Sequence, residues 1–225
     1  MLARHALIAG AHGLVGSRLL GLLLAHDAWT MLVAPVRRAL PVVHPKLSKP
    51  LVDFEQIDRF EPDIRIDDVF CCLGTTIAKA GSEAAFRRVD HDYVVSLARL
   101  ASRIGAKHFV MVSALGASSG SRVFYNRVKG EAETAVLALG LPRTTILRPS
   151  LLAGDRAESR PAERAGLLFA KLVGPLMLGS LRRYRAVDAG DVAAAMLAAT
   201  LAGTPVGTVE SEHIVELARG LGSRA

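Results

Sequence analysis

The chain has 225 residues and a formal net charge of +7, and 51% of its residues are hydrophobic while only 5% are aromatic. A chain of this length and apolar content can bury one substantial core, so we expect a single domain over residues 1–225 with an aliphatic interior. The arginines are scattered along the sequence without interleaved aromatic residues, so the positive charge does not predict nucleic-acid binding.

The cysteine content and the apolar runs indicate which kinds of protein this chain does not resemble, namely disulfide-rich, zinc-binding and membrane proteins. The two cysteines, Cys71 and Cys72, are adjacent, which excludes a disulfide or zinc framework, and we expect no metal site and a cytoplasmic location. A membrane span needs about 18 consecutive apolar residues. The nearest run, residues 166–179, is interrupted by a lysine and a Gly-Pro pair. No cleavage site of a secretory signal follows the N-terminal apolar run, so we expect a soluble protein without membrane partners.

Short apolar runs alternate with longer segments of helical spacing along the chain. The runs predict buried strands at residues 5–10, 29–34, 50–54, 67–74, 107–114 and 143–150. Helices are predicted at Leu14–Ala25, Ser82–Ile104, Arg122–Leu139 and 186–201. Repeated strand–helix units predict an α/β fold, a doubly wound parallel sheet that binds ligands at the carboxyl ends of its strands.

The remaining segments are expected to connect or cover this sheet. The proline-rich segment 41–50 is typical of a surface connection. After residue 149 the pattern loosens, and we expect residues 150–225 to contribute a small substrate-binding cap. The apolar segment 166–179 would then roof a substrate pocket or form a subunit interface, two alternatives that the sequence leaves open.

The stretch LIAGAHGLVGSRLL, residues 7–20, places three glycines between the first predicted strand and the first predicted helix. The first glycine permits a tight turn, the second lets the backbone approach a pyrophosphate, and the third lets the helix pack closely on the sheet. Free amides and the helix dipole attract the anion there. The spacing predicts a dinucleotide site formed by Gly10, Ala11, His12, Gly13, Leu14, Val15 and Gly16.

The segment after the second predicted strand indicates which dinucleotide to expect. An NAD site typically has an acidic residue about 20 residues beyond the glycines, where it binds the ribose 2′-hydroxyl. This sequence has Arg37 and Arg38 there and no acid, and two guanidinium groups suit a 2′-phosphate. We therefore predict NADP(H) in preference to NAD(H). The alternative is that both arginines only cover the edge of the sheet.

Two further segments are predicted to line the coenzyme. Asp53, at the end of the third predicted strand, is placed to accept a hydrogen bond from the adenine amino group. The segment CLGTT, residues 72–76, ends the next strand, and its small residues allow the backbone to lie beneath a ribose. The residues predicted to contact the coenzyme in this segment are Cys72, Leu73, Gly74 and Thr75.

A second constellation follows the strand predicted at residues 107–114. Tyr125 and Lys129 are four residues apart, so they share one face of a helix, and Ser113 precedes the tyrosine by twelve residues. A free tyrosine titrates near 10 and is a poor base at neutral pH, but a nearby ammonium favours the phenolate. We predict Ser113, Tyr125 and Lys129 as catalytic residues, with Tyr125 and Lys129 also contacting the coenzyme.

The combination of motifs resembles the short-chain dehydrogenase/reductase superfamily in its atypical and extended branches. More narrowly, CCLGTTIAKAG, RVDHDYV, KHFVMVSALGA, YNRVKGEAE and LRPSLLAGDRAESRP are similar to the Tat-interacting-protein oxidoreductases and their bacterial relatives. The resemblance implies a Rossmann fold with bound NADPH, and places Pro149 and Leu152 beside the nicotinamide. It departs at Asp90, where better-known members carry an asparagine whose backbone supports a proton relay, and this difference puts the relay in question.

The leading hypothesis is an NADPH-dependent oxidoreductase that transfers a hydride between nicotinamide and a carbonyl or hydroxyl compound, with a small-molecule substrate as its partner. Two alternatives stay open. One is an NADPH-binding regulatory or sensor protein with little or no turnover, and the other is an epimerase or isomerase of the nucleotide-sugar type. The sequence also leaves a homodimer open.

Overall fold

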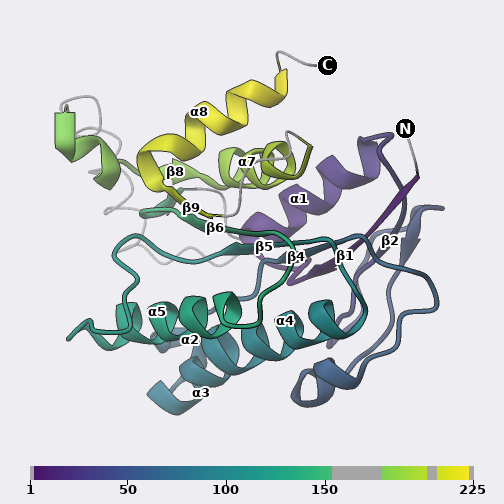
Figure 1. Ribbon diagram of the computed structural model, residues 1–225, viewed down its shortest axis with the longest axis horizontal. Helices are drawn as coiled ribbons and strands as arrows, with labels where there is room; N and C mark the ends of the chain where they lie inside the picture. The colour runs from purple at the N-terminus through teal and green to yellow at the C-terminus, as the bar shows by residue number, and fades with distance from the viewer. Residues whose placement is uncertain (1–2, 154–178, 202–206, 223–225) are drawn as a thin grey trace.

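The computed structural model describes residues 3–153, 179–201 and 207–222, and it shows one parallel sheet between two layers of helices (Figure 1). All pairings in this seven-stranded sheet are parallel, and its order is β3-β2-β1-β4-β5-β6-β9. The strands are β1 (Arg4–Ala9), β2 (Trp29–Val33), β3 (Leu47–Ser48), β4 (Asp68–Cys71), β5 (His108–Val112), β6 (Thr144–Arg148) and β9 (Gly207–Glu210). The doubly wound α/β prediction is confirmed.

Helices cover both faces of the sheet because each strand presents apolar side chains on both sides. Figure 1 shows α1 (Leu14–Ala25), α7 (Ala189–Leu201) and α8 (Ser211–Gly222) on one side. The other side carries the short helices α2 (Ile77–Ala80) and α3 (Glu83–Arg87), and the longer α4 (Tyr93–Arg103) and α5 (Phe124–Leu137). The strands at the centre of the sheet are buried: every residue of β4 and β5 is buried, and so are the first four of the five in β6. This double cover is what a buried parallel sheet requires.

Strand order reverses between β1 and β4. From β1 the chain adds β2 and β3 on one side, and then returns to add β4, β5, β6 and β9 on the other. Connections from β1 and from β4 therefore leave in opposite directions, and the ligand crevice of a doubly wound fold is expected where their carboxyl ends lie side by side. The first glycine of the predicted phosphate loop, Gly10, directly follows β1 at this point.

The strand predicted at residues 50–54 is misplaced. The paired residues are Leu47–Ser48, within the segment expected to be a connection, and only a single bridge between Val36 and Leu51 continues the ladder. Asp53 instead begins a 3-10 turn, η1 (Phe54–Arg59), by accepting a hydrogen bond from the Glu55 amide. This local capping bond ends the extended run, because it commits the backbone after Asp53 to a turn.

The helix predicted over Ser82–Ile104 is interrupted. A π-turn, η2 (Arg88–Asp92), separates α3 from α4. Such turns carry an additional residue per turn and often occur at functional sites. Here the π-turn contains Asp90, which is 1% exposed.

The cap predicted for residues 150–225 is placed differently for much of its length. Helix α7 packs against α1 on the sheet, β9 joins the sheet beside β6, and α8 packs on α7, so 189–201 and 207–222 belong to the main layers. Two short strands, β7 (Leu152–Ala153) and β8 (Val187–Asp188), form a separate ladder, and a 3-10 turn, η4, spans Gly179–Tyr184. The segment 166–178 lies outside the described residues. Among the helices described, none is long and apolar enough to cross a membrane.

Candidate functional site

The glycine loop between β1 and α1 is packed too tightly for side chains. Gly10 has φ +90°, and a Cβ built there would lie 2.4 Å from the carbonyl oxygen of Cys72. A Cβ on Gly16 would lie 2.1 Å from the carbonyl oxygen of Gly10. The Gly13 amide donates to that same oxygen at 2.8 Å, which closes the turn. The three glycines therefore bring the start of α1 against the backbone at the end of β4.

The start of α1 has the properties of an anion site. Gly13 caps the helix without a side-chain hydrogen bond, and the first turn contains no acidic residue. Ala11 and Val15 are buried, while His12 is exposed. A twelve-residue helix whose first turn is free of capping side chains presents its amides and positive dipole end to whatever lies in the crevice.

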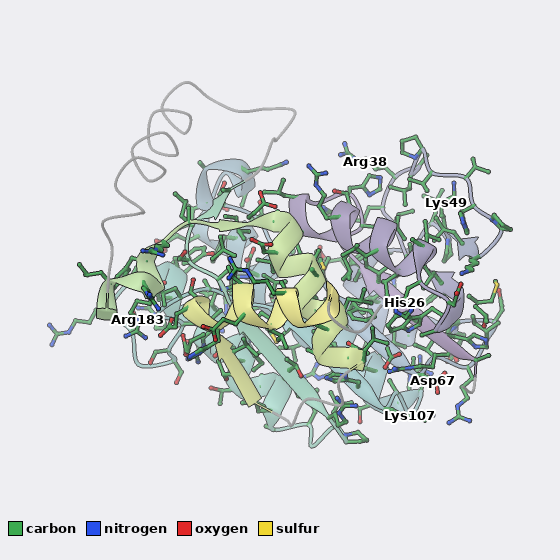
Figure 2. The ribbon with its side chains drawn as sticks, turned by 90° about the horizontal axis from the view of Figure 1, so that it is seen from above. His26, Arg38, Lys49, Asp67, Lys107 and Arg183 are labelled. Atoms are coloured by element: carbon green, nitrogen blue, oxygen red, sulfur yellow. The ribbon has the colours of Figure 1, made fainter. Side chains whose placement is uncertain are left out.

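The loop after β2 lies against the glycine loop. His12 Nε2 is 3.1 Å from the carbonyl oxygen of Ala39, which accepts its hydrogen, and Ala39 follows Arg37 and Arg38 directly. Both arginines are exposed, and Figure 2 labels Arg38 at the surface beside α1. The guanidinium of Arg37 also lies close enough to the phenol of Tyr93 to act on its pKa. The backbone that directly follows both arginines thus lies next to the glycine loop.

The predicted adenine contact, Asp53, already has a protein partner. Its Oδ1 accepts a hydrogen bond from the Glu55 amide at 3.0 Å. Nearby, the Tyr93 hydroxyl donates to Glu55 Oε1 at 2.6 Å. Burial and this bond to Glu55 raise the pKa of Tyr93 to about 12, so its phenol stays protonated. Asp53 retains Oδ2 for a further bond, and its contact with adenine stays a prediction.

The loop after β4 meets the second constellation through Asp90. One carboxylate oxygen of Asp90, Oδ2, accepts a hydrogen bond from the Thr75 amide at 2.8 Å. The other, Oδ1, lies 2.7 Å from Lys129 Nζ, and the two side chains are 1% and 5% exposed. A Cβ on Gly74 would lie 3.4 Å from Asp90 Oδ1 and 3.7 Å from Lys129 Nζ. Gly74, Thr75, Asp90 and Lys129 therefore form one contiguous cluster.

Lys129 is held as an ammonium within this cluster. Burial disfavours the charged form, but the Asp90 carboxylate and the Tyr125 side chain favour it, and the net effect raises the pKa of Lys129 above its ordinary value. Tyr125 precedes Lys129 by one helical turn on α5, and its ring packs on Phe86 of α3 with centroids 5.3 Å apart. Tyr125 and Lys129 therefore lie one turn apart on the same helix, and their joint catalytic role stays a prediction.

Ser113 lies one strand away at the same edge. It directly follows β5, and since Cys71 of β4 pairs with Met111 of β5, Ser113 lies level with the loop that follows Cys72. Its side chain is buried, and its Oγ has no hydrogen-bond partner among the residues the structure describes. A buried hydroxyl without a partner is costly unless a ligand or water completes it.

The last two predicted contacts lie at the end of β6. Pro149 is buried, and its carbonyl oxygen accepts the Leu115 amide at 2.8 Å, which ties this loop to the segment after Ser113. Leu152 lies in β7 and packs against the core layer that contains α1 and α7. Pro149 therefore borders the site, while Leu152 is partly engaged in the core.

The adjacent cysteines are apolar packing residues in this arrangement. Burial raises the pKa of Cys71 to about 11 and that of Cys72 well above its ordinary value. The thiol of Cys72 faces Met196 of α7, with the two sulfur atoms 3.8 Å apart. Neither side chain has the depressed pKa that a reactive thiol requires.

Taken together, the residues present fit a dinucleotide coenzyme. The crevice has a helix start free of acidic residues, a glycine loop in which a Cβ would collide with backbone, and a buried hydroxyl that lacks a partner among the described residues. The role of Asp90 as the partner of Lys129 is the main feature that the sequence analysis did not anticipate. A signal existed: Phe86, Asp90, Val94 and Leu97 follow helical spacing, and a carboxyl on an otherwise apolar face must be paired.

Comparison with known proteins agrees with this geometry. The sequence model of the NAD(P)H-binding family matches residues 10–200. The chain belongs to this family. It is 40% identical over 164 residues to Protein HTATIP2, a Tat-interacting protein, from Rattus norvegicus, an alignment that covers 71% of this chain and 67% of the relative. The predicted resemblance to the Tat-interacting proteins is therefore confirmed.

Two further similarities place this NAD(P)H-binding chain more broadly. It is 38% identical over 185 residues to "Protein fmp52, mitochondrial" of Emericella nidulans, covering 77% of each chain. Its fold matches UDP-glucose 4-epimerase from Thermotoga maritima with a TM-score of 0.67 and 17% identity, covering 97% of this chain and 82% of the epimerase. The Rossmann-like α/β fold is thus confirmed.

The predicted cytoplasmic location is wrong as stated. The fungal relatives of this family, from Emericella nidulans and several Aspergillus species, are named mitochondrial proteins. The prediction depended on two adjacent cysteines, and a lack of disulfides distinguishes poorly between reducing compartments.

Proposed function

We propose that this chain is an NADPH-dependent oxidoreductase that acts on a small carbonyl or hydroxyl compound. The observation that carries the proposal is the buried ammonium of Lys129, one helical turn from Tyr125 and adjacent to the loop Gly74–Thr75 in the crevice of an NAD(P)H-binding fold. An ammonium buried in that place has a chemical use for a neighbouring phenol and for a coenzyme ribose.

In this proposal the glycine loop and the start of α1 bind the diphosphate, and Asp53 and the segment 72–75 line the adenosine and ribose. Arg37 and Arg38 bind the 2′-phosphate as exposed cations that the His12–Ala39 hydrogen bond holds beside the glycine loop. Pro149 and Leu152 border the nicotinamide. The bound coenzyme supplies or accepts a hydride.

The catalytic roles follow from the same geometry. Tyr125 exchanges a proton through its hydroxyl with the substrate oxygen, and Lys129 favours the phenolate and holds the ribose. Ser113 donates its buried hydroxyl, which no described residue engages, to the substrate oxygen and so orients it. The substrate is a small molecule, and no nucleic acid, membrane or metal takes part.

Coenzyme preference is tested by binding. NADPH is expected to bind more tightly than NADH, and Arg37→Ala and Arg38→Ala should each weaken NADPH binding by roughly tenfold to a hundredfold while leaving NADH binding unchanged. Arg99→Ala, which removes an exposed arginine from α4, is the matched control. Equal affinity for both coenzymes in the unaltered chain would refute the assignment of Arg37 and Arg38.

Turnover is tested with a panel of carbonyl compounds, followed by loss of NADPH absorbance. Tyr125→Phe keeps the ring contact with Phe86 but removes the hydroxyl, so it should lower turnover by about a hundredfold or more while NADPH still binds. Turnover that survives this change would remove Tyr125 from the mechanism. Binding of NADPH without turnover of any compound would favour a coenzyme-binding regulator instead.

A further inference from the structure

Resting on this proposed function, we propose that Asp90 is a positioning residue that holds Lys129 in place and couples it directly to the coenzyme loop. Its two oxygen atoms have different partners: Oδ2 accepts a hydrogen bond from the Thr75 amide, and Oδ1 forms an ion pair with the Lys129 ammonium. One carboxylate therefore joins three separate elements, namely the π-turn η2, the loop after β4 and helix α5.

The burial of the pair explains why a carboxylate is needed. Lys129 and Asp90 are 5% and 1% exposed, so neither charge is stabilised by bulk water. The groups that act on Lys129 are Asp90 from η2, Tyr125 from α5 and Cys71 from β4, and of these only Asp90 is a carboxyl group. Without Asp90, desolvation would favour the neutral amine.

An amide at position 90 cannot replace these contacts. An asparagine has one oxygen, so it can accept from Thr75 or from Lys129, and its NH₂ group would face the remaining donor. The π-turn is what brings the carboxylate to this position, since it interrupts the regular helix between α3 and α4. Asp90 thus holds Lys129 through a direct ion pair between their side chains.

The first experiment measures the protonation of Lys129 directly. The chain has six lysines, so full-length protein labelled with ¹³Cε-lysine gives few NMR signals, and Lys129→Arg identifies the signal of Lys129 by its absence. In the unaltered chain this signal should titrate above the ordinary lysine value of about 10.4. In Asp90→Asn it should titrate below about pH 8, because burial then favours the neutral amine. The same midpoint in both proteins would overturn the proposal.

The second experiment connects the pair to the coenzyme. The ratio of NADPH dissociation constants, Asp90→Asn over unaltered chain, should rise at least tenfold between pH 6 and pH 9, because Lys129 loses its proton only in the variant. The ratio cancels the titration of the coenzyme phosphate. Introduced into a Lys129→Arg background, where the guanidinium stays charged throughout this pH range, Asp90→Asn should add no pH dependence. A ratio that does not change with pH, or a dependence that persists without Lys129, would overturn the proposal.

Controls separate the possible failures. Asp92→Asn removes an exposed carboxylate two residues away on the same turn and should leave both titrations unchanged. If Asp90→Asn does not fold, a Lys129 midpoint below the ordinary lysine value in the unaltered chain would still overturn the proposal, and a midpoint above it would support the pairing. If the unaltered chain binds no NADPH, the proposed function fails, while the NMR titration still decides the pairing.

Discussion

The two ends of the same parallel strands carry two different polar clusters. At the carboxyl ends, a glycine loop, a buried ammonium and the Ser113 hydroxyl, which no described residue engages, surround a crevice. At the amino ends, Asp68 is bound by Arg4 at 2.5 Å and by the indole N–H of Trp29 at 2.9 Å. Figure 2 shows Asp67 and Lys107, which form an ion pair at 2.8 Å, at the amino-end edge away from Arg38.

The difference shows how one fold separates stability from function. At the amino ends, charged groups form ion pairs and hydrogen bonds with other groups of the protein. Asp68 keeps its bonds to Arg4 and Trp29 although burial raises its pKa. At the carboxyl ends, donors are left for a ligand, which costs stability unless a ligand binds. Changes at one end should therefore alter stability alone, and changes at the other should alter coenzyme binding.

The largest effect is expected at the carboxyl ends from Gly16→Ala. The new methyl group would lie 2.1 Å from the carbonyl oxygen of Gly10, so the phosphate loop must move. We expect destabilisation of about 3 kcal/mol or more, because the clash is with backbone, and loss of the increase in melting temperature that NADPH gives the unaltered chain. Thermal denaturation with and without NADPH measures both.

Gly21→Ala is the matched control on the same helix. Gly21 is exposed, and a Cβ built there would have no atom of another element within 4 Å. This change should stabilise the chain by up to about 1 kcal/mol, because alanine favours the helix, and should leave the NADPH effect intact. A Gly16→Ala protein that binds NADPH normally would show that the crevice is not the coenzyme site.

The next largest effect is expected at the amino ends from Asp68→Ala. It leaves the buried indole N–H of Trp29 without its acceptor and Arg4 without its partner. We expect the free energy of unfolding to fall by about 3 kcal/mol, which lowers the melting temperature by roughly 6–12 °C. The NADPH dissociation constant of the folded protein should not change. A tenfold change in that constant would show that the amino ends of the strands also affect coenzyme binding.

An effect that is smaller at mildly acidic pH, also at the amino ends, comes from the titration of His108. Burial, followed by the charges of Arg143 and Arg4, lowers the pKa of His108 to about 3, from about 6.5 for a free histidine. Below pH 6.5 His108 therefore binds a proton in the unfolded chain but stays neutral in the folded chain. His108 should reduce stability by about 1.4 kcal/mol for each pH unit between 6.5 and 3, with no effect above that window.

Denaturant unfolding at several pH values isolates this contribution. His108→Gln should have a shallower loss of stability with falling pH than the unaltered chain. His213→Gln, which changes an exposed histidine on α8, should keep the original dependence. Equal slopes for His108→Gln and the unaltered chain would mean that the buried imidazole is protonated in the folded state.

The same contrast explains what the sequence could reveal. Local patterns predicted α1 with its observed bounds, Leu14–Ala25, and the tyrosine and lysine one turn apart on α5, because helical spacing is visible along the chain. The glycine loop was identified for the same reason. These features depend on residues that are close in sequence.

Features that depend on distant residues were missed. Asp90 and Lys129 are 39 positions apart, and only the packing of η2 on α5 brings them together. The strand β3 was misplaced because two residues of ladder leave little pattern. The helix at 189–201 was predicted, but its place beside α1 depends on the complete sheet.

The smallest effect is expected from Glu210→Gln, which tests whether Arg148 belongs with the paired charges or with the coenzyme site. Arg148 ends β6 at the carboxyl edge, yet it is paired with the buried Glu133 of α5 and, at 3.0 Å, with Glu210 of β9. These two glutamates raise the pKa of Arg148. Like the charged groups at the amino ends of the strands, Arg148 is therefore paired within the protein. Because Arg148 and Glu210 are 24% and 30% exposed, Glu210→Gln should cost no more than about 1 kcal/mol in denaturant unfolding and leave NADPH affinity unchanged. Weaker NADPH binding in this variant would instead place Arg148 among the residues that serve the crevice.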